Sequence, residues 1–151
     1  MKKIIFKIIT PEKIVYEGEV QKITLPVKEG DVTILPEHIP YIASLKAGEV
    51  VVFDTAAESH RLAISGGFIE FHDNALTLLA DTAENAKDLD LERAEIAKKR
   101  AQELKDQASE DDEEYARLVA MLEKETTRVH IARKHRTNHR KTISMDSVES
   151  Q

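Results

Sequence analysis

Residues 75–94, "ALTLLADTAENAKDLDLERA", contain the point at which a strand pattern gives way to a helix pattern. Up to residue 80 the segment alternates between two faces, as a half-buried strand does. From residue 81 to the end the chain contains no Gly or Pro and is rich in Ala, Glu, Lys, Leu and Arg, which favours helix. Asp90 stands just before the helical periodicity begins and is the expected N-cap. The segment therefore predicts a β unit followed by a helical unit.

Before this boundary, short apolar runs are separated by turn residues. Seven segments have the alternation and β-branched content of strands: 3–9, 20–25, 32–35, 49–54, 60–65, 67–71 and 75–80. Turn sequences such as Thr10-Pro11 and Gly66-Gly67 separate them. A run of about seven to ten short strands at this spacing is typical of an all-β sandwich or barrel. Residues 1–85 are therefore predicted to form a β-sandwich domain without a helix of useful length.

Two helices are predicted after the boundary, in residues 86–135. The first has an apolar stripe at three- and four-residue steps, formed by Leu91, Ala94, Ala97, Ala101, Leu104 and Ala108. Ser109 and Asp112 have the spacing of a capping box, so the second helix is expected to begin there and to run through Val129. The two are predicted to form an antiparallel hairpin with a seam made mostly of alanine, which buries little apolar surface. Such a hairpin is either a switch that can open or a permanently packed appendage, and the sequence favours neither.

The net charge of −6 argues against nucleic acid as the main partner, because that binding depends on Lys and Arg at phosphates. The charge is uneven, since residues 128–141 carry six Lys or Arg and no acid. This basic patch is expected to seek an acidic surface. Residues 136–151 pass from basic to polar and are predicted to form a disordered tail.

Catalytic and metal chemistry find no support in the sequence. The chain has no Cys, no GxxxxGK phosphate-binding loop and no Ser in a nucleophile elbow. His135 and His139 are four residues apart, but no carboxylate lies beside them, so no metal site is predicted. The apolar N-terminal run is too short for an export signal, and no stretch approaches the roughly 20 apolar residues that span a bilayer. A soluble protein that is not an enzyme is expected.

Several motifs in this order resemble one known family. They are "EGDVTILPEHIP" at 29–40, "LAISGGFIEF" at 62–71 followed by "DNALTLLADTAENAKDLD", and "LDLERA" at 89–94 with the helix after it. Together they resemble the ε subunit of F-type ATP synthases over about residues 1–130. The resemblance implies the same architecture that the patterns predict, an N-terminal β-sandwich with a C-terminal two-helix domain. It also implies a rotor subunit rather than an enzyme.

The resemblance implies partners as well. In that family the sandwich binds the γ subunit and touches the c-subunit ring, and the helical domain restrains ATP hydrolysis by extending toward the α and β subunits. The chain would then be peripheral on the cytoplasmic face of the bacterial inner membrane, associated with the membrane only through the complex. Glu29, Asp31 and His38 are the residues implied at the surface facing the c ring and γ, although His38 alternatively is an ordinary turn histidine. Thr33 stands where the family has a Gly, and a positive φ there would be costly for Thr.

The basic patch acquires a role from the resemblance. The family's second helix lies against an acidic segment of the β subunit in the restrained state, and Arg128, Arg133, Lys134 and Arg136 supply the matching charge. Exposed ion pairs contribute roughly 0.2 to 1 kcal/mol each, so such a set biases a close equilibrium without dominating it. The alternative is a solvated tail that aids solubility or touches anionic lipid.

The resemblance also raises the question of a regulatory nucleotide, although it implies no required cofactor. Some bacterial ε subunits bind ATP through an Ile/Leu-Asp-x-x-Arg-Ala motif, which residues 89–94 match. Asp90 and Arg93 would then contact ATP, and Glu84 and Arg100 are further contacts by position. The guanidinium groups of Arg93 and Arg100 can pair with phosphates, while Asp90 or Glu84 accepts hydrogen bonds from the sugar or the base. The arginine pair that the family's ATP-binding members carry on the second helix is missing here. The alternative function is a stand-alone nucleotide-sensing module.

Overall fold

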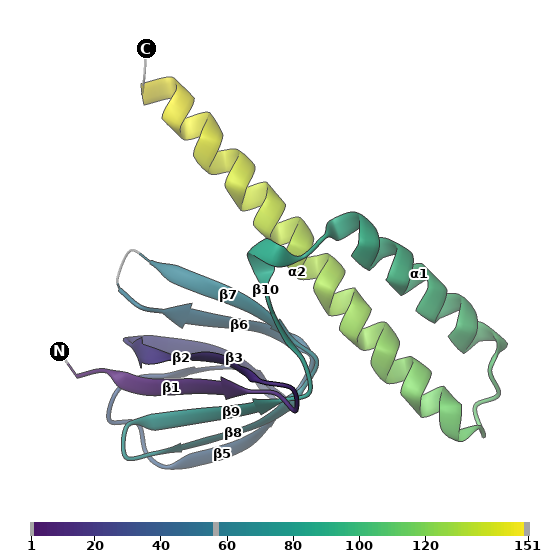
Figure 1. The fold of residues 1–151 in the computed structure, drawn as a ribbon, viewed down its shortest axis with the longest axis horizontal. Helices are drawn as coiled ribbons and strands as arrows, with labels where there is room; N and C mark the ends of the chain where they lie inside the picture. Colours follow the sequence, from purple (N-terminus) through teal and green to yellow (C-terminus); the bar gives the residue numbers. More distant parts are fainter. Residues whose placement is uncertain (1, 56–57, 150–151) are drawn as a thin grey trace. The chain divides into compact units, whose positions relative to one another are not determined.

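The computed structural model describes residues 2–55 and 58–149, with side chains described as far as residue 138. The chain divides into two compact units, Met1–Asn85 and Ala86–Gln151. Figure 1 shows strands gathered in the first unit and helices lying side by side in the second. The division falls where the composition changes from strand-forming to helix-forming residues.

The first unit is one continuous, mostly antiparallel sheet that folds over on itself. Its strands are β1 (Ile4–Ile9), β2 (Ile14–Val20), β3 (Lys22–Val27), β4 (Gly30–Ile34), β5 (Tyr41–Leu45), β6 (Gly48–Phe53), β7 (Ser59–Ile64), β8 (Gly67–His72), β9 (Ala75–Ala80) and β10 (Ala83–Asn85). Their order is β10-β7-β6-β3-β5-β8-β9-β1-β2, with β4 paired to β3. The β1 and β9 strands run parallel, whereas the other pairs are antiparallel.

The sandwich core is built by alternation along the strands. Ile4, Phe6 and Ile8 of β1 are fully buried, while the residues between them face outward. The same two-residue period buries Leu76 and Leu78 of β9. Each fully buried aliphatic or aromatic side chain contributes roughly 1.5 to 3 kcal/mol, so this inward face is the main source of the unit's stability.

The expected fold class, a β-sandwich followed by two helices, is confirmed. All seven predicted strand segments correspond to strands, and no boundary is shifted by more than two residues. Three further strands, β2, β5 and β10, had not been assigned to a segment. The β3 strand also passes through Pro26, at which the segment had been expected to stop, because Pro26 lies opposite Asp31 of β4 near the end of the ladder.

Tyr16, Asp54 and His60 tie the edge strand β2 to the β6–β7 hairpin. The Tyr16 hydroxyl donates to Asp54 Oδ1 at 2.9 Å, and His60 Nε2 lies 2.5 Å from Asp54 Oδ2. Burial, the hydrogen bond to Asp54 and the charge of Asp54 together raise the pKa of Tyr16 to about 12. The phenol therefore stays protonated and remains a donor to Asp54 through the physiological pH range.

The second unit contains the short helix η1 (Ala86–Asp88), α1 (Leu91–Gln107) and α2 (Glu113–Glu149). The α2 helix begins at Glu113 rather than at Ser109, because Ser109 and Asp112 form the connecting turn. In this turn the Asp112 N–H donates to the Ser109 carbonyl at 3.0 Å. No helix among the described residues is long and apolar enough to cross a membrane.

The seam between α1 and α2 is narrow. Ala94 and Ala101 are buried on α1, while Leu104, which had been placed on the seam, is exposed. The α2 side contributes Leu118 and Val129, which are also buried. Because both buried residues of α1 are alanines, α1 contributes little apolar surface to the contact between the helices.

The predicted tail differs from the structure. Residues 136–151 were expected to be disordered, but α2 continues without a break to Glu149, past residue 135 at which the two-helix region had been expected to end. Residues 136–149 contain no Gly or Pro that would break the helix, so a polar composition there is compatible with helix as well as with disorder. Residues 150 and 151 lie outside the described residues.

Candidate interaction surfaces

An apolar row crosses the outer face of four neighbouring strands. The register places Phe68 of β8 opposite Leu79 of β9, Leu79 beside Ile9 of β1, and Ile9 opposite Ile14 of β2. Phe68, Leu79 and Ile14 are 59%, 52% and 53% exposed, and Ile9 is partly buried. We call Phe68, Leu79, Ile9 and Ile14 the apolar row. The signal for it in the sequence is limited to apolar residues at outward positions of three predicted strands.

A surface groove adjoins the apolar row. It has a volume of about 570 Å³, and its lining includes Ile9, Pro11, Lys28, Phe68, Leu79 and Asp81. Gly67 lies at its edge with a φ of 147°, a conformation that favours glycine. The groove and the apolar row together form a surface that can receive apolar side chains, with Lys28 and Asp81 as polar margins.

Residues 35–40 form an ordered loop between β4 and β5, which we call the docking loop. The His38 N–H donates to the Leu35 carbonyl at 3.2 Å, and the His38 ring stands edge-on to the rings of Tyr41 and Phe71. The loop also presents Ile39, which is 73% exposed. His38 therefore has ring and backbone contacts that are compatible with an ordinary turn histidine.

The residues predicted to face the c ring and γ do not form one cluster. Glu29 precedes β4 and Asp31 lies at its start, whereas His38 follows its end. Four residue steps of a strand span about 13 Å, so the β4 strand itself separates His38 from Glu29. The predicted cost at Thr33 does not arise, since Thr33 lies within β4 and its hydroxyl bonds to that of Thr24 at 2.8 Å.

The predicted nucleotide contacts are divided between the units. Asp90 is the N-cap of α1, as expected, because its Oδ1 accepts from the Arg93 N–H at 3.2 Å. Arg93 and Arg100 are both exposed on α1, next to the buried Ala94 and Ala101. Glu84 belongs to β10 of the first unit. The structure thus brings Asp90 together with the backbone of Arg93.

The predicted inhibitory residues are engaged to different degrees. Arg128 pairs with the buried Glu125 at 2.8 Å on the same helix, so an ion pair within α2 holds its guanidinium. Arg133 Nη2 reaches Glu95 Oε1 of α1 at 2.7 Å. Lys134 and Arg136 are exposed. Arg133, Lys134 and Arg136 therefore present cationic groups at the surface of α2.

A second groove lies between α1 and α2 and was not predicted. It has a volume of about 530 Å³ and is lined by Glu95, Lys98, Lys99, Gln102, Glu103, Val129 and Arg133. Neither Arg93 nor Arg100 lines it. Within the described side chains, no group of three or more His, Asp or Glu could hold a metal ion, and the side chain of His139 lies outside them.

Comparison with known proteins identifies relatives over both units. A family model described as "ATP synthase, Delta/Epsilon chain, beta-sandwich domain" matches residues 3–86, and the "long alpha-helix domain" of the same chain matches residues 87–133. The ATP synthase epsilon chain of Pediococcus pentosaceus is 40% identical over 129 residues, covering 83% of this chain and 92% of the relative. The epsilon chain of Thioalkalivibrio sulfidiphilus is 41% identical over 135 residues, covering 88% and 94%.

A solved structure supports the fold. A chain in the cryo-EM structure of the Euglena gracilis mitochondrial ATP synthase, which contains OSCP, F1 and the c-ring, matches with a TM-score of 0.68 at 22% identity. The match covers 80% of this chain and 76% of that chain. At this identity the likeness shows a shared fold.

Proposed function

Because the chain belongs to the ATP synthase delta/epsilon family, we propose that it is the ε subunit in the central stalk of an F-type ATP synthase. In this role it catalyses no reaction. Its sandwich couples rotation between the c ring and γ, and its helical unit restrains ATP hydrolysis by contact with the α and β subunits. The observation that carries the proposal is the apolar row on the sandwich, because a subunit that transmits rotation needs a firm attachment to the stalk.

The apolar row has the chemistry of an attachment surface. Neighbouring exposed apolar side chains on the outer face of a sheet are a feature of interaction surfaces. Burying Phe68, Leu79 and Ile14 would contribute roughly 1.5 to 3 kcal/mol each, before the cost of association is subtracted. We assign this surface to the γ subunit, with the adjoining groove receiving γ side chains. The c ring is assigned to an end of the sandwich, where Glu29 and Asp31 lie.

The helical unit has the features of a restraint that can change partners. Its seam depends on Ala94 and Ala101, so little burial is lost when the helices separate. The Arg133–Glu95 pair is largely exposed and contributes roughly 0.2 to 1 kcal/mol, so an acidic segment of the β subunit can replace Glu95 at little cost. Lys134 and Arg136 would add to that contact. A small difference in affinity then decides between the two arrangements.

The restraint predicts an effect of charge removal on ATPase activity. In a complex reassembled with the Lys134→Gln/Arg136→Gln variant, we expect ATP hydrolysis about three- to tenfold faster than with wild-type chain at low salt. The reason is the loss of two ion pairs worth roughly 0.2 to 1 kcal/mol each, which shifts the balance away from the restrained state. The difference should shrink as salt rises, since salt screens exposed charges.

The matched control for this measurement is Lys98→Gln/Lys99→Gln, which removes the same charge from α1 and leaves both α2 cations in place. We expect it to hydrolyse ATP at the wild-type rate. Equal rates for all three chains at low salt would contradict the proposed restraint. Both variants retain the Arg133–Glu95 ion pair between α1 and α2.

We also propose that ATP regulates the helical unit through Asp90, Arg93, Arg100 and Glu84. Arg93 and Arg100 are two helical turns apart, about 10.5 Å along α1, so their long side chains can approach different parts of one polyphosphate. Asp90 uses Oδ1 for the N-cap, and its Oδ2 can accept a hydrogen bond from a ribose hydroxyl or from the adenine amine. The support is the matching motif and the exposure of both guanidinium-bearing residues.

The ATP proposal can be tested separately from helix stability. Arg93→Ala keeps the N-cap, because Asp90 accepts from the backbone N–H of residue 93. We expect this variant to bind Mg-ATP about tenfold more weakly in isothermal titration, since a charge-assisted hydrogen bond contributes roughly 1.5 to 3 kcal/mol. Arg117→Ala, which removes an exposed arginine from α2, should bind ATP like wild type. An unchanged affinity for Arg93→Ala would remove this residue from the site.

A further inference from the structure

Three residues of the sandwich have an unusual backbone. Among the described residues other than glycine, only Glu37, Asp73 and Asn74 have positive φ, at 65°, 50° and 59°. Asp73 and Asn74 form the β8–β9 turn, where this conformation is common. Glu37 lies in the docking loop, far from them in sequence, and glutamate pays a cost for the left-handed region.

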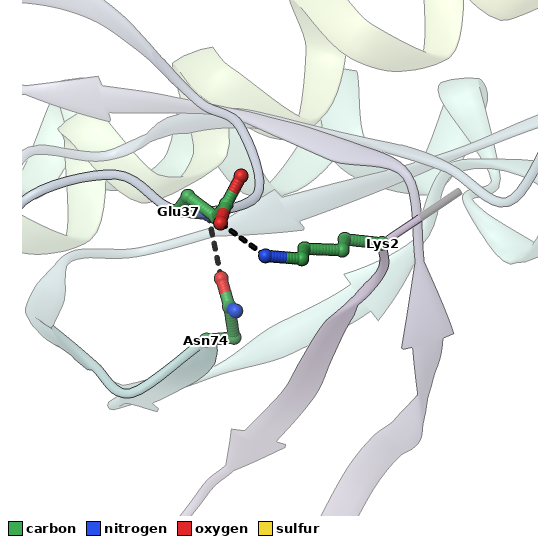
Figure 2. Close-up of polar contacts among 3 residues, drawn as sticks. All are labelled: Lys2, Glu37 and Asn74. Atoms are coloured by element: carbon green, nitrogen blue, oxygen red, sulfur yellow. Dashed lines mark hydrogen bonds and ion pairs between the residues drawn. The ribbon is translucent and has the colours of Figure 1, made fainter.

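Glu37 is held in this conformation by two neighbours. Its N–H donates to Asn74 Oδ1 at 2.6 Å, and its carboxylate forms an ion pair with Lys2. Figure 2 shows the Asn74 side chain and the Lys2 ammonium converging on Glu37 from the turn and from the start of the chain. We call Lys2, Glu37 and Asn74 the loop clamp. The clamp joins three segments that are separate in sequence, so it fixes the docking loop against the body of the sandwich.

The loop that the clamp holds displays apolar side chains. Leu35 and Ile39 are 54% and 73% exposed, and Pro36 and Pro40 stiffen the backbone next to each of them. The exposed part of these apolar side chains gains no burial in the isolated domain, while the left-handed backbone at Glu37 is costly. Strain of this kind persists where a fixed geometry serves a contact.

Apolar exposure continues from the docking loop to the apolar row. Ile42, just after the loop on β5, is exposed and points to the same outer face as Ser44. Ser44 lies directly opposite Phe68 of the apolar row. A partner that covers the apolar row can therefore extend over Ser44 and Ile42 to the end of β5, where the docking loop joins this strand.

We propose that the loop clamp positions the docking loop as a second contact with the stalk, with Leu35 and Ile39 touching γ, the partner assigned to the apolar row. This inference rests on the proposed function. Lys2, Glu37 and Asn74 are positioning residues, since they set the loop conformation and need not touch γ themselves. Asn74 is the main one, because its side chain bonds to the backbone that must stay left-handed.

The experiment measures the affinity of full-length variants for the cognate ATP synthase complex stripped of this subunit. Asn74→Gly removes Oδ1 while leaving a residue that accepts the φ of 59° at the turn, so it isolates the clamp. We expect it to bind about tenfold more weakly, because the left-handed Glu37 loses its supporting hydrogen bond. Glu37→Gln, which loses only an exposed ion pair, should bind within about twofold of wild type.

A rescue variant separates positioning from general destabilisation. Glu37→Gly adopts a φ of 65° without help, so Asn74→Gly/Glu37→Gly should bind at least as tightly as Glu37→Gly alone. Thermal unfolding of Asn74→Gly should stay close to that of wild type, since the groups it disconnects are exposed. Equal binding by Asn74→Gly and wild type, or a loss that Glu37→Gly fails to rescue, would overturn the inference. Failure of the wild-type chain to bind would instead reject the proposed function.

Discussion

Replacing Gly67 with alanine is expected to lower the free energy of unfolding of the sandwich by about 4 kcal/mol. Gly67 has a φ of 147°, and a Cβ built on it would lie 2.0 Å from the Leu79 carbonyl oxygen and 2.9 Å from Ala80 Cα. These are backbone atoms of the strand paired with β8, so they cannot move without opening the ladder. Backbone strain of roughly 1 to 3 kcal/mol adds to an overpacking cost of similar size.

The control for this prediction is Gly30→Ala. Gly30 has a φ of 144°, close to that of Gly67, but a Cβ there meets no atom within 4 Å. Gly30→Ala should therefore lower the free energy of unfolding only through backbone strain, by about 2 kcal/mol. Denaturant-dependent hydrogen exchange of the buried Ile69 and Leu78 amides measures both variants on the affected strands. If the two substitutions cost the same, steric contact between β8 and β9 does not explain the need for glycine at position 67.

Local patterns explain why β9 was predictable and β2 was not. Leu76 and Leu78 alternate strictly with outward residues, so β9 was predicted with its observed bounds. The β2 strand contains Glu17, Gly18 and Glu19 and buries only its last residue, so it lacks the apolar alternation of a half-buried strand. It is nevertheless stable as a strand because it pairs along the whole length of β1.

The candidate surfaces were predictable only where contacts are local. The Asp90 N-cap joins residues three apart and follows from residue type and periodicity. The Glu37–Asn74 bond and the Arg133–Glu95 pair join residues 37 and 38 apart, which no local pattern encodes. The apolar row likewise needs the register of four strands before its members become neighbours.

Replacing Phe68 with glutamate is expected to weaken attachment of the chain to the complex at least about 100-fold. Phe68 sits in the apolar row and also lines the adjoining groove, so γ should cover its ring in the complex. The substitution removes about 2 to 3 kcal/mol of apolar burial and places a carboxylate where it loses water. Each 1.4 kcal/mol corresponds to a factor of ten in affinity. The measurement is titration of the complex stripped of this subunit, followed by coprecipitation with γ.

A matched variant distinguishes the apolar row from a general effect of added charge. Ser59→Glu places the same charge at an exposed position on β7, a strand that carries no member of the apolar row, and should bind within about twofold of wild type. Because Phe68 is 59% exposed in the free chain, its loss should leave thermal stability nearly unchanged. A folded Phe68→Glu chain that attaches as tightly as Ser59→Glu would move the γ contact away from this face. A selective loss of binding would instead mean that the outward apolar residues are kept for the stalk, since the sandwich folds without burying them.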